Sequence, residues 1–91
     1  MLGVIIPAHN EEKNIEKVID NVLACGVEPL HIFVIDNNST DRTKILSEKK
    51  NVNVYEVKRL GYQVALREGL ALLDKKQYSQ FCIVDGDNEI G

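Results

Sequence analysis

The fold class of this chain follows from residues 2–26, which read LGVIIPAHNEEKNIEKVIDNVLACG. The first part, Leu2–Ile6, is a short apolar run closed by Pro7, and such a run predicts a buried β-strand. A helix is predicted next, because apolar residues recur at the spacing i, i+3, i+4, i+7 and i+8 that gathers them on one face. These residues are Ile15, Val18, Ile19, Val22 and Leu23.

The ends of this first helix are marked by residues with known preferences. Asn10 can cap it, and Glu11 and Glu12 in its first turn would favour the positive end of the helix dipole. Gly26 is the expected stop, with Pro29 just beyond it. We therefore expect the helix to begin directly after Asn10.

The rest of the chain alternates strands and helices in the same way. Further strands are predicted at His31–Ile35, Val52–Val57 and Phe81–Val84. Helices are predicted from about Thr40 to Lys49, with Ile45 and Leu46 inward, and from Tyr62 to about Lys76. The last helix has an apolar face of Tyr62, Ala65, Leu66, Gly69, Leu70 and Leu73. In residues 52–57, polar and apolar side chains occur on both faces of the predicted strand, so we expect it to lie at a less buried edge of the sheet.

This order of elements predicts an α/β fold with a three-layer, Rossmann-like arrangement. Buried strands joined through helices favour a mostly parallel sheet of about four strands, with right-handed crossovers and three helices on its two faces. No repeat, low-complexity tract or linker interrupts the 91 residues. We expect one domain, residues 1–91.

Composition excludes several classes of partner. The net charge of −3 gives no electrostatic footprint for nucleic acid. No apolar run approaches the ~18 residues of a membrane span, and the first residues do not resemble a signal peptide. Cys25 and Cys82 lie among apolar residues, so we expect two buried thiols in a reducing, cytoplasmic setting.

Polar residues follow three of the predicted strands. They are Ala8-His9-Asn10-Glu11, Asp36-Asn37-Asn38-Ser39 and Asp85-Gly86-Asp87. In an open α/β sheet, ligands bind beyond the carboxyl ends of the strands, so a nucleotide laid there would meet all three clusters. The Asp-x-Asp of the last cluster suits a divalent cation that holds a diphosphate.

Other motifs are absent, and plainer roles remain open for single residues. There is no G-x-G-x-x-G and no G-K-[ST], and a calcium-binding loop would need glycine where Ile90 stands. Asp85 and Asp87 could lie in a solvated turn, and Asp36 or Asn10 could cap a helix. His9, Glu11, Glu12, Lys58 and Arg59 could be surface residues.

The motifs together resemble the nucleotide-sugar-binding half of a family 2 glycosyltransferase, which has the GT-A fold. The resemblance rests on Ile5–Glu12, Val34–Asp41, Gly61–Gly69 and Asp85–Asp87, and it covers essentially the whole chain. The polyprenyl-phosphate sugar synthases are among the members that look similar. The family's usual Gly-Lys-Gly reads Gly61-Tyr62-Gln63 here, and Lys58 and Arg59 could substitute for the missing lysine.

This resemblance implies a site for a UDP- or GDP-sugar. Pro7 to Asn10 would shape the pocket for the base, His9 would stack on it, and Asp36 would accept a hydrogen bond from it. Asp85 would lie near the ribose and the metal, and Asp87 would ligate Mg²⁺ or Mn²⁺. The implied nucleotide-sugar contacts are Pro7, Ala8, His9, Asn10, Glu11, Asp36, Asn38, Gly61, Asp85 and Gly86, and the implied metal ligands are Asp85 and Asp87.

The resemblance also implies a limit on activity. The parent reaction would be an inverting sugar transfer, but the family's acceptor half and catalytic base follow the Asp-x-Asp strand. We therefore expect a donor-binding domain that is inactive alone, at most associated with the cytoplasmic face of a membrane as part of a larger enzyme. The alternative is a non-catalytic module that binds nucleotide or self-associates through an exposed sheet edge beside residues 81–84.

Overall fold

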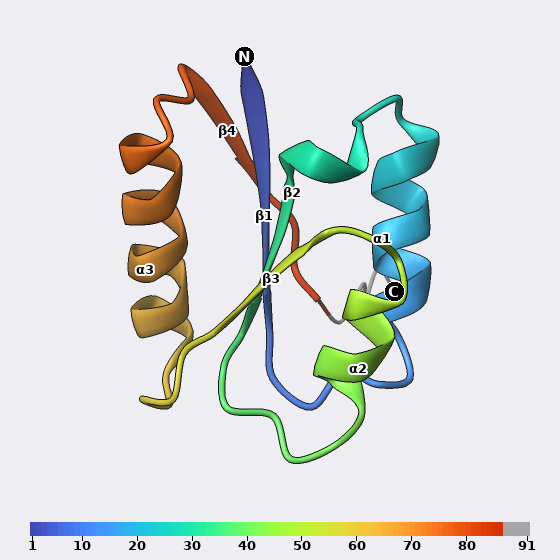
Figure 1. Ribbon diagram of the computed structural model, residues 1–91. Coiled ribbons are helices and arrows are strands. Elements are labelled where there is room, and N and C mark those ends of the chain that lie inside the picture. The colour runs from blue at the N-terminus through green and yellow to red at the C-terminus, as the bar shows by residue number, and fades with distance from the viewer. Residues whose placement is uncertain (87–91) are drawn as a thin grey trace.

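The computed structural model describes residues 1–86 and shows a four-stranded sheet in which all strands are parallel (Figure 1). The strand order is β3-β2-β1-β4. The strands are β1 (Leu2–Ala8), β2 (Ile32–Asp36), β3 (Asn53–Glu56) and β4 (Gln80–Ile83). The predicted mostly parallel sheet and the edge position of the third strand are both confirmed.

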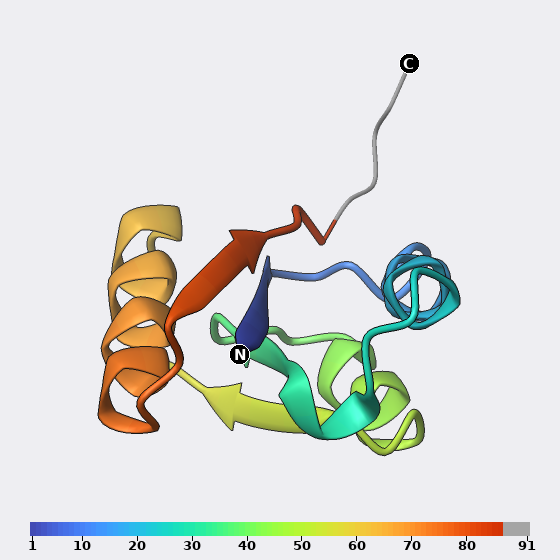
Figure 2. The same ribbon diagram turned by 90° about the horizontal axis from the view of Figure 1, so that it is seen from above.

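Three helices cover the two faces of this sheet. They are α1 (Ile15–Ala24), α2 (Thr43–Glu48) and α3 (Tyr62–Lys75), with a short 3₁₀ turn, η1 (Pro29–His31), before β2. Figure 2 shows α3 on one side of the sheet and α1 with α2 on the other. The predicted three-layer α/β architecture is confirmed.

The core consists of two apolar clusters separated by the sheet, because side chains alternate between the faces of a strand. On the α1 side, Val4 and Ile6 of β1 pack with the buried face of α1. On the α3 side, Ile5 packs with Phe33, Ile35 and helix α3. The central strands β1 and β2 are therefore buried from both faces, as their continuous apolar runs predict.

The expected start of the first helix is wrong. Helix α1 begins at Ile15 with Asn14 at the N-cap position, so Asn10, which lies in the preceding loop with a φ of +52°, is not its cap. The Asn10 side chain accepts a hydrogen bond from the Thr40 backbone N–H (2.8 Å) instead. Loop contacts outweigh the local capping preference here, and Glu11 and Glu12 lie in the loop before the helix.

Helix α2 buries the polar residues Thr43 and Ser47, whereas the sequence predicts that the apolar Ile45 faces inward. Ile45 is 51% exposed, so its predicted inward position is wrong, whereas Thr43 and Ser47 are fully buried. These two residues are one turn apart, and the Ser47 hydroxyl donates to the Thr43 carbonyl (2.8 Å). Internal hydrogen bonding makes the burial of this polar face possible.

Strand β4 is more exposed than its apolar sequence predicts. Phe81 and Ile83 are 57% and 37% exposed, because β4 lies at the edge of the sheet, beyond β1. Cys82 on this strand and Cys25 just after α1 are both exposed, which corrects the expectation of buried thiols. Within residues 1–86 no helix has both the length and the hydropathy needed to span a membrane.

Candidate functional site

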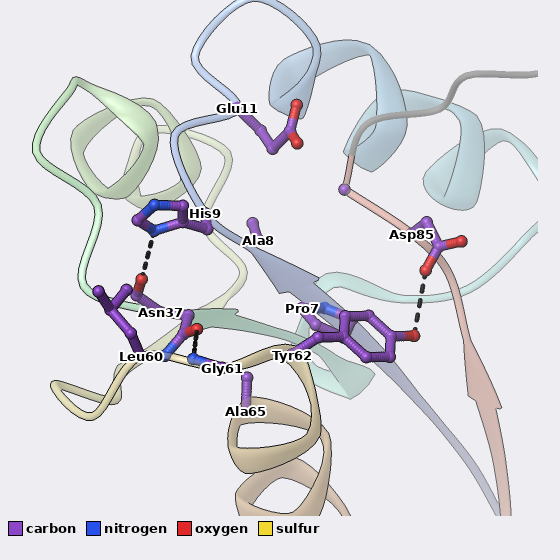
Figure 3. Close-up of a pocket in the computed structure, with 11 residues that line it drawn as sticks. Pro7, Ala8, His9, Glu11, Asn37, Leu60, Gly61, Tyr62, Ala65 and Asp85 are labelled. Carbon is purple, nitrogen blue, oxygen red and sulfur yellow. Dashed lines mark hydrogen bonds between the residues drawn. The ribbon is translucent and has the colours of Figure 1, made fainter.

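A cavity of about 690 Å³ opens at the carboxyl ends of β1, β2 and β4, beside the first turn of α3 (Figure 3). Strand β1 has β2 on one side and β4 on the other, so the cavity lies where the strand order reverses. Ligand sites of open α/β sheets occur at such points. The lining residues are Pro7, Ala8, His9, Glu11, Asn37, Leu60, Gly61, Tyr62, Ala65, Asp85 and Gly86.

The cavity brings together most of the residues predicted for the site. Those that line it are Pro7, Ala8, His9, Glu11, Gly61, Asp85 and Gly86. Asn10, Asp36 and Asn38 do not line it. Asp87 lies outside the described residues. Tyr62 was predicted for the helix core, but it is 52% exposed and faces the cavity, which corrects that expectation.

Asn37 organises one wall of the cavity; it belongs to the predicted polar cluster 36–39 but was not predicted as an individual site residue. Its side-chain amide donates to the carbonyls of Val57 (3.2 Å) and Arg59 (2.8 Å), and its Oδ1 accepts from the Gly61 N–H (2.9 Å). These bonds hold the loop between β3 and α3. Asn37 is 4% exposed. The sequence signal that could have found it is its amide side chain in the polar cluster 36–39, directly after an apolar strand.

His9 is held against the same residue in one tautomer. Its Nδ1 lies 2.7 Å from the carbonyl oxygen of Asn37, and because a carbonyl only accepts, Nδ1 carries the proton. The Nε2 atom then accepts from the side-chain amide of Asn10 (3.3 Å), which agrees with a neutral ring. The ring is thus fixed at the cavity wall with both nitrogens occupied.

Close to the cavity, the loop between β1 and α1 is hydrogen-bonded to the segment that follows β2. The Asn10 N–H donates to the Ser39 hydroxyl (2.9 Å), and the Glu11 N–H donates to the Thr43 hydroxyl (2.7 Å). The Glu12 N–H donates to the carboxylate of Asp41 (3.1 Å). Asn10 therefore supports the site by fixing a loop, without lining the cavity.

Gly86 lines the cavity because the backbone comes very close to β1 there. A Cβ atom at this position would lie 2.8 Å from the Pro7 carbonyl oxygen and 3.0 Å from the Ala8 side chain. The Gly86 N–H donates to that same carbonyl (3.2 Å). Gly61, on the opposite wall, has a φ of +138°, a conformation that side chains rarely adopt.

Tyr62 and Asp85 face each other at the end of the cavity away from His9 (Figure 3). The Tyr62 hydroxyl donates to Oδ1 of Asp85 at 3.2 Å. Partial burial, the hydrogen bond to Asp85 and the negative charge of Asp85 together raise the pKa of Tyr62 above its ordinary value of 10.0. The phenol therefore stays protonated and remains a donor throughout the neutral pH range.

Asp36 lies at the end of β2, next to the cavity wall that Asn37 builds. It is 1% exposed, and its Oδ1 has no hydrogen-bond partner among the described residues. Its carbonyl accepts from the Val57 N–H (2.8 Å), so the backbone is fixed while the side chain retains a free acceptor. A buried carboxylate oxygen without a donor is energetically costly, which is typical of functional positions.

The lining is acidic and, among residues 1–86, contains no lysine or arginine. Glu11 and Asp85 contribute carboxylates, whereas Lys58 and Arg59 line a separate hollow with Arg67. The suggested replacement of the missing lysine by Lys58 or Arg59 is therefore wrong for this cavity. A diphosphate placed here would meet two negative side chains without a compensating cation from the described protein.

A metal ion at this cavity would have to be coordinated partly by the bound substrate. In residues 1–86 no group of three or more His, Cys, Asp or Glu side chains is arranged to hold a metal ion. Mg²⁺ in nucleotide sites is commonly bound by one or two carboxylates and by substrate phosphates, with waters completing the shell. Asp85 at the cavity fits this donor set.

Comparison with known proteins agrees with this geometry. The family model described as Glycosyl transferase family 2 matches residues 3–90. Protein RfbJ of Shigella flexneri is 37% identical over 87 residues, which cover 96% of this chain and 64% of RfbJ. The chain thus spans slightly less than two thirds of this relative.

Solved structures of glucosyl-3-phosphoglycerate synthase from Mycobacterium tuberculosis share the fold. One, without a named ligand, superposes with a TM-score of 0.78 at 29% identity and covers 96% of this chain and 34% of that chain. Another, a complex with Mn²⁺, UDP-glucose and phosphoglyceric acid, gives a TM-score of 0.77 at 28% identity over 94% of this chain and 33% of that chain. The likeness therefore covers about one third of those enzymes.

Proposed function

The chain belongs to glycosyl transferase family 2, and we propose that its cavity binds a UDP-sugar together with Mg²⁺ or Mn²⁺. The observation that carries this proposal is the acidic lining at the point of strand-order reversal. Two carboxylates without a lysine or arginine in the described lining suit a diphosphate only when a divalent cation accompanies it. The complex of the similar synthase with UDP-glucose and Mn²⁺ supports this choice of ligands.

The base would occupy the end of the cavity near His9 and Leu60. The imidazole of His9, fixed by two hydrogen bonds, offers a flat surface for stacking. Asp36 supplies the unpartnered acceptor Oδ1, which would take a hydrogen bond from an N–H of the base. Because Asp36 is buried behind the cavity wall, binding would require a small movement of that wall.

The diphosphate would occupy the end near Asp85 and Gly86. The Asp85 carboxylate would hold the cation, which stabilises the negative charge that develops when a nucleoside diphosphate leaves. Gly86 lets the backbone of this segment lie directly against β1, where a larger residue would displace it. The chain's own contribution at this end is thus to place one carboxylate beside the phosphates.

We further propose that the parent reaction is an inverting transfer, and that this 91-residue chain supplies donor binding alone. Such a transfer needs a catalytic base, a proton-accepting side chain within hydrogen-bond reach of the acceptor hydroxyl. Within the described lining, both His9 nitrogens are occupied, Glu11 accepts from the Asn14 amide (3.3 Å), and Asp85 accepts from Tyr62. Each of these groups is held in the site by a hydrogen bond, and the proposal assigns none of them to the acceptor hydroxyl.

Titration calorimetry tests the donor site. We expect UDP to bind in the presence of Mn²⁺, to bind much more weakly in EDTA, and to bind more tightly than GDP. Asp85→Asn should lower the affinity in Mn²⁺ by about tenfold or more. The matched control Asp74→Asn, on the last turns of α3 and away from the cavity, should bind like the wild type.

Three results would each contradict a part of the proposal. Absence of binding to either nucleotide in Mn²⁺ would exclude a donor site in this chain. Nucleotide binding that is equal in Mn²⁺ and in EDTA, and equal in Asp85→Asn, would exclude the metal and the role of Asp85. Transfer of labelled sugar by the purified chain would contradict the restriction to donor binding.

A further inference from the structure

The Tyr62–Asp85 hydrogen bond connects the first turn of α3 to the segment that follows β4. Tyr62 is the first residue of α3, and Asp85 follows β4, 23 positions later. Figure 3 shows the phenol reaching across the cavity to the carboxylate. The bond therefore lies at the end of the cavity where we propose that the diphosphate binds.

Asp85 has a fixed backbone and a weakly restrained side chain. The neighbouring N–H groups of Val84 and Gly86 donate to the carbonyls of Ile5 (2.9 Å) and Pro7 (3.2 Å), which attaches this segment to β1. Among the described residues, the Asp85 side chain makes no salt bridge, and its one hydrogen bond comes from Tyr62. The orientation of its carboxylate thus depends on the phenol.

We propose that Tyr62 is a positioning residue for Asp85: its hydroxyl occupies Oδ1 and turns Oδ2 toward the cation and diphosphate. This inference rests on the proposed function. A lysine, which the resemblance leads one to expect at this position, would offer its charge to the phosphates directly. The neutral phenol acts through the carboxylate instead, and the cation becomes the main counter-charge of the diphosphate.

Packing does not account for Tyr62. The side chain is 52% exposed and does not belong to the apolar cluster between α3 and the sheet, which contains Ala65 and Leu73. An exposed tyrosine that only covered surface would keep its function as phenylalanine. Tyr62→Phe removes the hydroxyl and keeps the ring, so this variant distinguishes a role in positioning Asp85 from a role in packing.

The test is the metal dependence of UDP binding in Tyr62→Phe, measured by calorimetry. We expect the gain in UDP affinity on adding Mn²⁺ to fall about three- to tenfold, since a hydrogen bond to a charged group is lost. UDP affinity in EDTA and the melting temperature should stay as in the wild type. The control Tyr55→Phe removes a hydroxyl from the exposed side of β3 and should change neither affinity.

A double-mutant cycle shows whether Tyr62 acts through Asp85. If it does, Tyr62→Phe in an Asp85→Asn background should cost no further affinity in Mn²⁺. Additive losses, or a Tyr62→Phe variant with the wild-type gain from Mn²⁺, would overturn the positioning role and leave the donor site intact. A wild-type chain that shows no Mn²⁺-dependent UDP binding would instead refute the proposed function and this inference together.

Discussion

At the residue scale, Asn37 connects the sequence to the shape of the cavity. One amide group makes three hydrogen bonds to the loop that carries Leu60 and Gly61, and the Asn37 carbonyl accepts from His9. Both walls at the proposed base end therefore depend on this one residue, one through its side chain and the other through its backbone carbonyl. The Asn38 side chain, its neighbour, makes no such contact among the described residues.

We expect Asn37→Ala to lower the free energy of unfolding by about 1–3 kcal/mol, because it leaves partly buried loop groups without partners. Urea denaturation measures this change. The control Asn38→Gly should stay within about 0.5 kcal/mol, since glycine suits the φ of +53° at that position. Equal stability of Asn37→Ala and the wild type would contradict the role of this amide.

The hydrogen-bonded carboxyl of Asp41 makes the stability of the protein depend on pH in the acidic range. Desolvation by burial acts to raise its pKa, but hydrogen bonds from the Thr43 hydroxyl and N–H and from the Glu12 N–H outweigh this and lower the pKa below 3.8. A carboxyl whose pKa is lowered by folding stabilises the protein above its unfolded pKa, and this contribution is lost as the pH falls through the folded pKa.

The stability difference between wild type and Asp41→Asn should therefore be constant from pH 7 to about 5 and shrink below pH 3.8. Denaturation curves across this range measure it. Asp74→Asn, whose side chain makes no hydrogen bond or salt bridge within residues 1–86, serves as the control. A difference for Asp41→Asn that persists unchanged at pH 3 would exclude the lowered pKa.

At the scale of elements, helix α3 lies close to the sheet because of Gly69. A Cβ atom there would lie 2.8 Å from Cγ2 of Ile5 and 3.1 Å from Cγ1 of Ile35. Both atoms belong to buried side chains of the central strands, so they have little room to move. The closeness of α3 also places its first residues, Tyr62 and Ala65, at the cavity.

We expect Gly69→Ala to destabilise the protein by about 1 kcal/mol, because overpacking of about 1–3 kcal/mol exceeds the helix-propensity gain of about 1 kcal/mol. Thermal or urea denaturation measures the net effect. Glu68→Ala on the exposed side of α3 should be neutral within about 0.5 kcal/mol. An increase in stability for Gly69→Ala would show that the helix moves away from the sheet without cost.

At the scale of the whole molecule, the edge strand β4 leaves apolar surface uncovered. Phe81 and Ile83 are exposed, and β4 has a strand partner on one side alone within the described residues. An edge of this kind can pair with a second copy of the chain. Self-association through β4 stays a prediction, and sedimentation of the wild type beside Phe81→Lys would decide it.

The sequence by itself determined the order of the elements, the parallel sheet and the gathering of three loops at one end. Strong apolar periodicity and buried strands leave little choice of architecture, and parallel strands bring their carboxyl ends to one edge. His9 and Asp85 were placed at the cavity on this basis, whereas Pro7 and Gly61 were expected there from the resemblance to the family. Local patterns suffice for such predictions because they reflect which face of each element must be buried.

Only the tertiary structure decided the start of α1, the exposed face of α2 and the roles of Asn37 and Tyr62. These depend on contacts between segments about 20–30 positions apart, such as Asn10 with Thr40 and Tyr62 with Asp85. Capping preferences and helical periodicity describe neighbours along the chain and do not contain these partners. The free energy of long-range hydrogen bonds and close packing then overrides the local preference.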